Sequence, residues 1–165
     1  MSASTCLPCT TTTGTGSARP TASPSTGYRG AHDDGEHVAL VPGKVEGALG
    51  VPLAVHVECL ASDVFGATTC ACGSELDAAL ATAAAAGRGI VVYARSSEHV
   101  RACGLLGDGR SVEDRYAVAA AVAASIVTDL AVGSVELVAT PAGLRAALEP
   151  VGLRSDDAPR YSVAG

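Results

Sequence analysis

Residues 51–77, VPLAVHVECLASDVFGATTCACGSELD, join a predicted strand to a predicted helix through a cysteine-rich turn. The three cysteines Cys59, Cys70 and Cys72 lie within fourteen residues. A disulfide between Cys70 and Cys72 would be badly strained, because only one residue separates them. Three thiolates that meet at a strand end and a nearby turn suit a tetrahedral zinc ion whose fourth position is left open to water. The pattern therefore favours a hydrolytic metal site over three small buried side chains.

The hydrophobic pattern on both sides of this stretch alternates between strands and helices. The strand at 51–57 delivers Glu58 and Cys59 at its carboxyl end. A helix opens at 73–77, with Ser74 as N-cap and Asp77 at the N3 position, and Gly87 ends it. The other predicted elements are strands at 36–43, 89–94 and 135–139, a loop at 96–110, and helices from Ser111 to about Leu130 and from Thr140 to Gly152. This order predicts an α/β fold with a mixed or parallel sheet layered with helices, which binds ligands at the carboxyl ends of its strands.

Length, charge and hydropathy exclude several classes of function. The 165 residues suffice for one domain with its own core. A formal net charge of -6 and the lack of a Lys/Arg run argue against nucleic-acid or anionic-membrane partners. The longest helix-like apolar run, residues 117–127, falls short of the ~20 residues that a membrane span needs. Without a recognisable secretory signal, we expect a cytoplasmic protein with reduced thiols.

The N-terminal segment differs in composition from the rest of the chain. Residues 1–30 are rich in Ser, Thr, Pro and Gly, so we expect a disordered tail, followed by a folded domain over 31–165. The tail contains Cys6 and Cys9 in a Cys-x-x-Cys pattern. No second pair of ligands lies nearby, and we interpret this pair as a chance occurrence.

Seven short motifs lie along the chain: EHVAL (36–40), AVHVECLASD (54–63), TCACGSELD (69–77), GRG (87–89), VYAR (92–95), DLAV (129–132) and AALE (146–149). Together they resemble GTP cyclohydrolase II, the zinc hydrolase of riboflavin biosynthesis. The resemblance covers roughly residues 36–153. The three-cysteine spacing with its flanking Glu and Gly is the specific part of it.

The resemblance implies an activity and a set of site residues. Cys59, Cys70 and Cys72 would hold zinc, and a water on that zinc would attack C8 of a guanine ring and release formate. The corresponding substrate-binding residues are Glu58, Glu75, Glu98 and Arg101, and Asp114 with Arg115 could supply the catalytic Asp-x-Arg of the family if the helix start has shifted. The implied substrate is GTP or a related purine and the implied assembly is a homodimer, whereas assistance from Mg²⁺ is left open.

The chain departs from the family pattern where the family binds triphosphate. The family's Arg before the Val-His pair is Ala54, its Asp between the two cysteines is Ala71, and its Gln is Glu75. The family's Thr and Lys segment is replaced by residues 139–144, ATPAGL. Because phosphate sites gather cations, the loss of the family's Arg and Lys and the carboxylate added at Glu75 weaken nucleotide binding. Two alternatives therefore stay open: a catalytically degenerate paralogue whose structural zinc supports a binding or dimerisation module, and a decaying gene product.

Two residues near the motifs are interpreted as structural. His56 lies on the strand that ends at Glu58, and we interpret it as a buried histidine with a hydrogen-bond partner, not as a metal ligand. Cys103 follows in the polar loop, and we interpret it as a small apolar filler.

Overall fold

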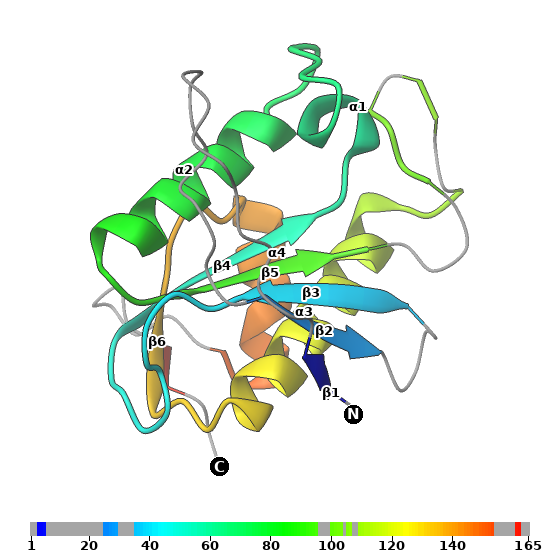
Figure 1. Ribbon diagram of the computed structural model, residues 1–165. Coiled ribbons are helices and arrows are strands. Elements are labelled where there is room, and N and C mark those ends of the chain that lie inside the picture. The colour runs from blue at the N-terminus through cyan, green and yellow to red at the C-terminus, as the bar shows by residue number, and fades with distance from the viewer. Residues whose placement is uncertain are drawn as a thin grey trace, which may run out of the picture.

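The computed structural model describes residues 3–5, 25–29, 35–95, 100–103, 105–106, 109–153 and 161–162 (Figure 1). The strands are β1 (Ala3–Thr5), β2 (Ser25–Arg29), β3 (Glu36–Leu40), β4 (Val51–Val57), β5 (Ile90–Ala94), β6 (Ser134–Leu137) and β7 (Tyr161–Ser162). The helices are α1 (Leu60–Asp63), α2 (Cys72–Ala85), α3 (Val112–Asp129) and α4 (Ala142–Leu148), and α4 continues into a 3₁₀ turn, η1 (Glu149–Val151).

The strands form one mixed sheet in the order β1-β2-β3-β5-β4-β6-β7. At its centre, β4 pairs in parallel with β5 on one side and with β6 on the other. The remaining pairs are antiparallel, among them β3 with β5 and β2 with β3. The α/β class with a mixed sheet and layered helices is thus confirmed. The carboxyl ends of β4 and β5 meet at one edge, as parallel pairing requires.

Helices cover both faces of the sheet (Figure 1). Alternate residues of β4 point to opposite faces, as the two-residue period of a strand dictates. Ala54 packs with Leu76, Ala79 and Ala83 of α2 on one face. Leu53 belongs to the larger core formed with α3 and α4 on the other face. The contact between α2 and β4 is thus made largely by small alanine side chains.

The start of α2 differs from the prediction. The helix begins at Cys72, and Ser74 is not its N-cap, because the Ser74 hydroxyl donates to Ala71 O at 2.8 Å. The N–H of Gly73, in the first turn of the helix, instead donates to the Ser62 hydroxyl of α1 at 2.9 Å. A tertiary contact therefore replaces the local cap that the sequence pattern suggested.

The other predicted helix boundaries agree better with the structure. Gly87 follows α2 with a φ of 66°, the left-handed conformation that ends helices. Ser111 caps α3, since its hydroxyl accepts the N–H of Asp114 at 3.0 Å. Helix α4 begins at Ala142, two residues after Thr140, and Gly152 ends the 3₁₀ turn with a φ of 89°.

The segment that we expected to be a disordered tail contains part of the sheet. Within residues 1–30, positions 3–5 and 25–29 form β1 and β2. Strand β2 pairs along its length with β3, and the Tyr28 side chain is 3% exposed. A strand needs only backbone pairing and one buried face, so a Ser/Thr/Gly-rich composition does not prevent it. Cys6 and Cys9 lie outside the described residues.

No helix of the described residues is long and apolar enough to cross a membrane.

Candidate metal centre

Cys59 follows the carboxyl end of β4 and occupies the N-cap position of α1. Its side chain is fully buried. The Asp63 carboxylate accepts the Cys59 N–H at 2.8 Å, which closes the single turn of α1. The turn therefore holds the Cys59 sulfur at the sheet edge where parallel-sheet ligands bind.

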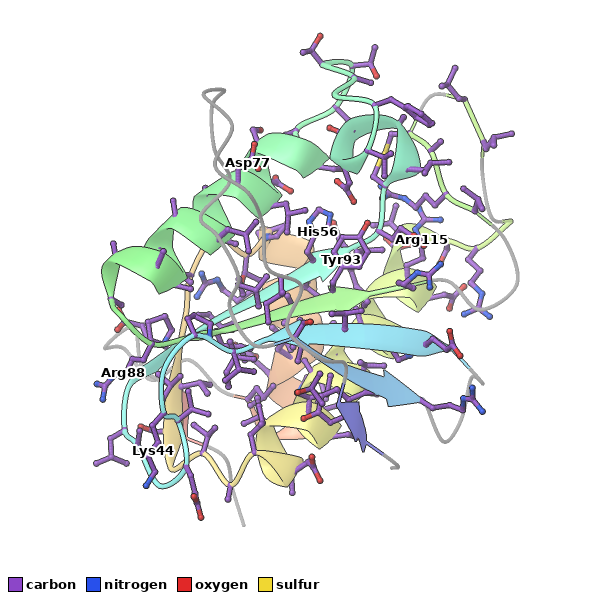
Figure 2. The ribbon with its side chains drawn as sticks, in the orientation of Figure 1. Lys44, His56, Asp77, Arg88, Tyr93 and Arg115 are labelled. Carbon is purple, nitrogen blue, oxygen red and sulfur yellow. The ribbon has the colours of Figure 1, made fainter. Side chains whose placement is uncertain are left out.

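A buried polar network supports this turn from below. The Oδ2 atom of Asp63 lies 2.9 Å from His56 Nε2 and accepts the Tyr93 hydroxyl at 2.8 Å. The His56 and Tyr93 rings stack with centroids 5.3 Å apart, side by side under α2 in Figure 2. Burial alone would raise the pKa of Asp63, but the hydrogen bonds from His56, Cys59 and Tyr93 lower it below its ordinary value. The interpretation of His56 as a structural histidine agrees with this pairing.

Four cysteine sulfurs, not three, gather beside this turn. The Sγ atoms of Cys59, Cys70, Cys72 and Cys103 all lie within 4.8 Å of one another. The Cys59–Cys70 and Cys72–Cys103 Sγ pairs are each 3.8 Å apart. Zinc–sulfur bonds of about 2.3 Å in a tetrahedron place neighbouring sulfurs about 3.8 Å apart. The cluster thus has the donor type and the spacing that a tetrahedral zinc ion needs.

The environments of these thiols differ. The backbone N–H of Cys72 donates to the Cys70 sulfur and lowers the pKa of the Cys70 thiol to about 7. Burial raises the pKa of Cys72 and also that of Cys103. The Arg101 guanidinium donates to Cys103 Sγ at 2.8 Å and lies 3.9 Å from Cys72 Sγ. The Arg101 cation thus lies against Cys72 and Cys103, the two thiols whose pKa is raised.

Cys72 also belongs to the wall of a small pocket between α2, β4 and α4. The described residues that line it are Ala54, Val55, His56, Val57, Cys72, Glu75, Ala79, Arg101, Tyr116, Ala139, Pro141 and Leu144. Its cavity volume is about 40 Å³, room for a few water molecules. Among these lining residues Arg101 is the only Lys or Arg, and Glu75 adds a carboxylate. Figure 2 shows Lys44 and Arg88 at the opposite end of the sheet from His56.

The substrate-binding residues that the resemblance implies fall into three groups. Glu75 and Arg101 lie together in the wall of this pocket. Glu58 instead pairs with Arg95, with 3.3 Å between Oε1 and Nε. Glu98 lies outside the described residues.

The proposed catalytic pair takes part in the start of α3. Asp114 exchanges hydrogen bonds with Ser111, whose hydroxyl donates to Asp114 Oδ2 at 2.9 Å. Arg115 donates to the carbonyl of Arg110 at 2.6 Å. Neither Asp114 nor Arg115 is among the described residues that line the pocket. In the described structure Asp114 is the hydrogen-bond partner of the Ser111 cap, and Arg115 binds the segment just before α3.

Sequence reasoning did not assign Cys103 to the cluster. The residue lies 31 positions after Cys72, in a polar loop with no metal-binding spacing around it. The one signal was compositional: a fourth cysteine followed the three-cysteine motif. The interpretation of Cys103 as a small apolar filler does not account for its sulfur, which lies 3.8 Å from that of Cys72.

Comparisons with known proteins agree with the resemblance. The GTP cyclohydrolase II family model matches residues 17–156. Riboflavin biosynthesis protein RibBA of Salinispora tropica is 38% identical over 143 residues, which cover 77% of this chain and 36% of the relative. The RibBA proteins of Mycolicibacterium gilvum and Rhodococcus jostii are each 53% identical over 76 residues, covering 44% of this chain and 18% of each relative. This chain thus spans about a third or less of the length of these relatives. The residues that the family model matches include every strand and helix from β2 to η1. The chain belongs to the GTP cyclohydrolase II family.

Proposed function

We propose that the chain is a zinc-dependent hydrolase of the GTP cyclohydrolase II type, which opens the imidazole ring of a guanine nucleotide and releases formate. Family membership supports the reaction class, and the relatives are riboflavin biosynthesis proteins by name. The observation that carries the proposal is that Cys72 belongs both to the sulfur cluster and to the pocket wall. Zinc held by the cysteines would lower the pKa of a bound water, which could then attack C8 of the ring.

The pocket residues would bind and orient the substrate. The Glu75 carboxylate offers two acceptor oxygens, which match the two adjacent N–H donors on the pyrimidine edge of guanine. Arg101 is held against the Glu58 carbonyl at 2.9 Å, so its guanidinium stays fixed at the pocket wall. A fixed cation costs little reorganisation when a charged substrate binds. A nucleotide is larger than the present cavity, so binding requires the pocket to widen.

Formate release tests this proposal. We expect the purified chain to contain zinc and to release formate from GTP, and the assay is run with and without Mg²⁺. Glu75→Ala removes both acceptor oxygens from the pocket wall, and it should raise the KM. Asp77→Ala, at an exposed residue two positions later on α2, is the matched control and should leave the KM unchanged. Zinc-loaded protein that releases no formate from any guanine nucleotide would refute the hydrolase.

A second candidate function is favoured by the fourth sulfur and by the single cation of the pocket wall. In it, the chain is a catalytically degenerate paralogue whose structural zinc stabilises a binding or dimerisation module. A closed site of four thiolates is the usual form of structural zinc. Under this function Cys70→Ser destabilises the fold on loss of zinc, whereas no hydrolysis is lost. For either function we propose a homodimer, and light scattering of the purified chain would measure its mass.

A further inference from the structure

Cys103 reaches the sulfur cluster from a segment that carries none of the other three cysteines. It lies in the connection between β5 and α3, whereas Cys59, Cys70 and Cys72 lie at the ends of β4 and α2. Its Sγ atom is 3.8 Å from that of Cys72, and its backbone N–H donates to the Cys59 sulfur at 3.4 Å. Cys103 therefore contacts the cluster through both its side chain and its backbone.

The backbone around Cys103 is held in place by the rest of the fold. The carbonyl of Arg101 accepts the N–H of Leu60, the first residue of α1, at 2.8 Å. Ala102 is 3% exposed, and its carbonyl accepts the N–H groups of Leu105 at 2.9 Å and Leu106 at 2.8 Å. A turn closed in this way, with its first residue buried, fixes the direction in which the Cys103 side chain leaves the backbone.

Arg101 supplies the positive charge that a tetrathiolate needs. Four thiolates around a divalent ion leave a net charge of about −2. The Arg101 guanidinium donates to Cys103 Sγ at 2.8 Å and lies 3.9 Å from Cys72 Sγ. It also donates to the Glu58 carbonyl at 2.9 Å and lies 3.5 Å from the Val57 carbonyl. It thus ties the Cys103 turn to the carboxyl end of β4. Groups that orient ligands in this way are an integral part of metal sites.

We infer that Cys103 is a fourth thiolate ligand, positioned by Arg101, so that zinc in this chain is enclosed by Cys59, Cys70, Cys72 and Cys103. The inference rests on the proposed zinc binding but not on the proposed hydrolysis. One consequence is that the Cys103 sulfur occupies the coordination position that a hydrolytic water requires. If the chain is a hydrolase, water has to displace Cys103, and removal of this thiol opens the coordination position to water.

The direct test is X-ray absorption spectroscopy of the zinc-loaded chain. It uses a Cys6→Ser/Cys9→Ser background, in which the four cluster cysteines are the only ones left. We expect a first shell of sulfur alone in this protein. In Cys103→Ala and Cys103→Ser we expect one sulfur to be replaced by an oxygen or nitrogen ligand. The thiolate-to-metal charge-transfer absorbance of the cobalt-loaded variants should fall by about a quarter, because one of the thiolates is lost.

Arg101→Gln tests the positioning role. It should weaken zinc binding by about 10- to 100-fold while the first shell keeps its sulfur count, as expected for a group that orients a ligand. Arg101→Lys should recover part of the affinity. Arg110→Gln, a change of the same kind in the same connection, is the matched control and should leave zinc affinity unchanged. Equal affinities of Arg101→Gln and the unaltered chain would refute the positioning role.

The outcomes separate the ligand inference from the proposed function. A first shell of three sulfurs and one lighter atom in the unaltered chain overturns the inference, even if formate is released. A metal-free protein with a Cys72–Cys103 disulfide, detected by thiol counting and non-reducing mass spectrometry, also overturns it. Four sulfurs without formate release support the inference and refute the hydrolase. Four sulfurs with formate release that rises in Cys103→Ala support both. Should the Cys103 variants fail to fold, the spectrum of the unaltered chain still decides.

Discussion

Gly73 offers a way to displace the cysteines of α2 without changing any of them. A Cβ atom at this position would lie 2.7 Å from Ser62 Oγ and 3.0 Å from Ser62 O, whereas ordinary contact begins near 3.4 Å. Gly73→Ala should therefore move the start of α2 away from α1. That movement would carry Cys72 away from Cys59, which lies at the other side of this contact.

The structure gives the size of this effect. Overpacking costs about 1–3 kcal/mol, and loss of the bond from Gly73 N–H to Ser62 Oγ costs about 1 kcal/mol. The higher helix propensity of alanine returns up to about 1 kcal/mol. A net loss of about 2 kcal/mol should lower the Tm by roughly 4–8 °C. Misplaced ligands should also lower zinc affinity by about 10- to 100-fold.

Gly89→Ala is the matched control at the opposite end of α2. Its Cβ would lie 2.8 Å from Ala83 Cβ, so a similar overlap arises, but far along the helix from the cysteines. Both variants should lower the Tm of the metal-free protein in a thermal scan, and only Gly73→Ala should weaken zinc in a chelator competition. Adding Ser62→Ala to Gly73→Ala removes the closest contact and should restore part of the affinity. Equal zinc affinity in the two glycine variants would refute this account of how α2 positions the cluster.

Three further predictions concern the sheet and the network below the cluster. Burial, together with the negative charge of Asp129, raises the pKa of Tyr28 to about 12. The folding stability linked to this shift is present below the unfolded pKa of about 10 and is lost as the pH rises through the folded pKa. An ultraviolet titration, with Tyr28→Phe as the reference, measures the pKa of Tyr28. A value near 10 would contradict the placement of β2. Asp63→Asn should cost about 3 kcal/mol in urea unfolding, because it breaks a buried charged network, and a loss below 1 kcal/mol would show that this network contributes little. Arg95→Ala should cost at most about 1 kcal/mol in the same assay, since Arg95 is 45% exposed in its pair with Glu58; a larger loss would assign the pair a structural role that its exposure does not explain.

The sequence by itself determined the local features of this protein. The apolar run of β4, the glycine after α2 and the serine that caps α3 are read from neighbouring residues, because strand period and helix caps depend on contacts a few positions apart. The spacing of Cys59, Cys70 and Cys72 was enough to predict that they share a site. The motifs around them were enough to identify the family.

Only the tertiary structure decided which distant groups complete the site. Cys103 Sγ meets Cys72 across 31 positions, and its N–H meets Cys59 across 44. The cap of α2 comes from Ser62 on another helix, and the burial of Tyr28 comes from pairing of β2 with β3. No local pattern encodes these contacts, because they join segments that are far apart in the sequence and meet only in the folded chain. The same packing places a fourth sulfur beside the three that the motif supplies.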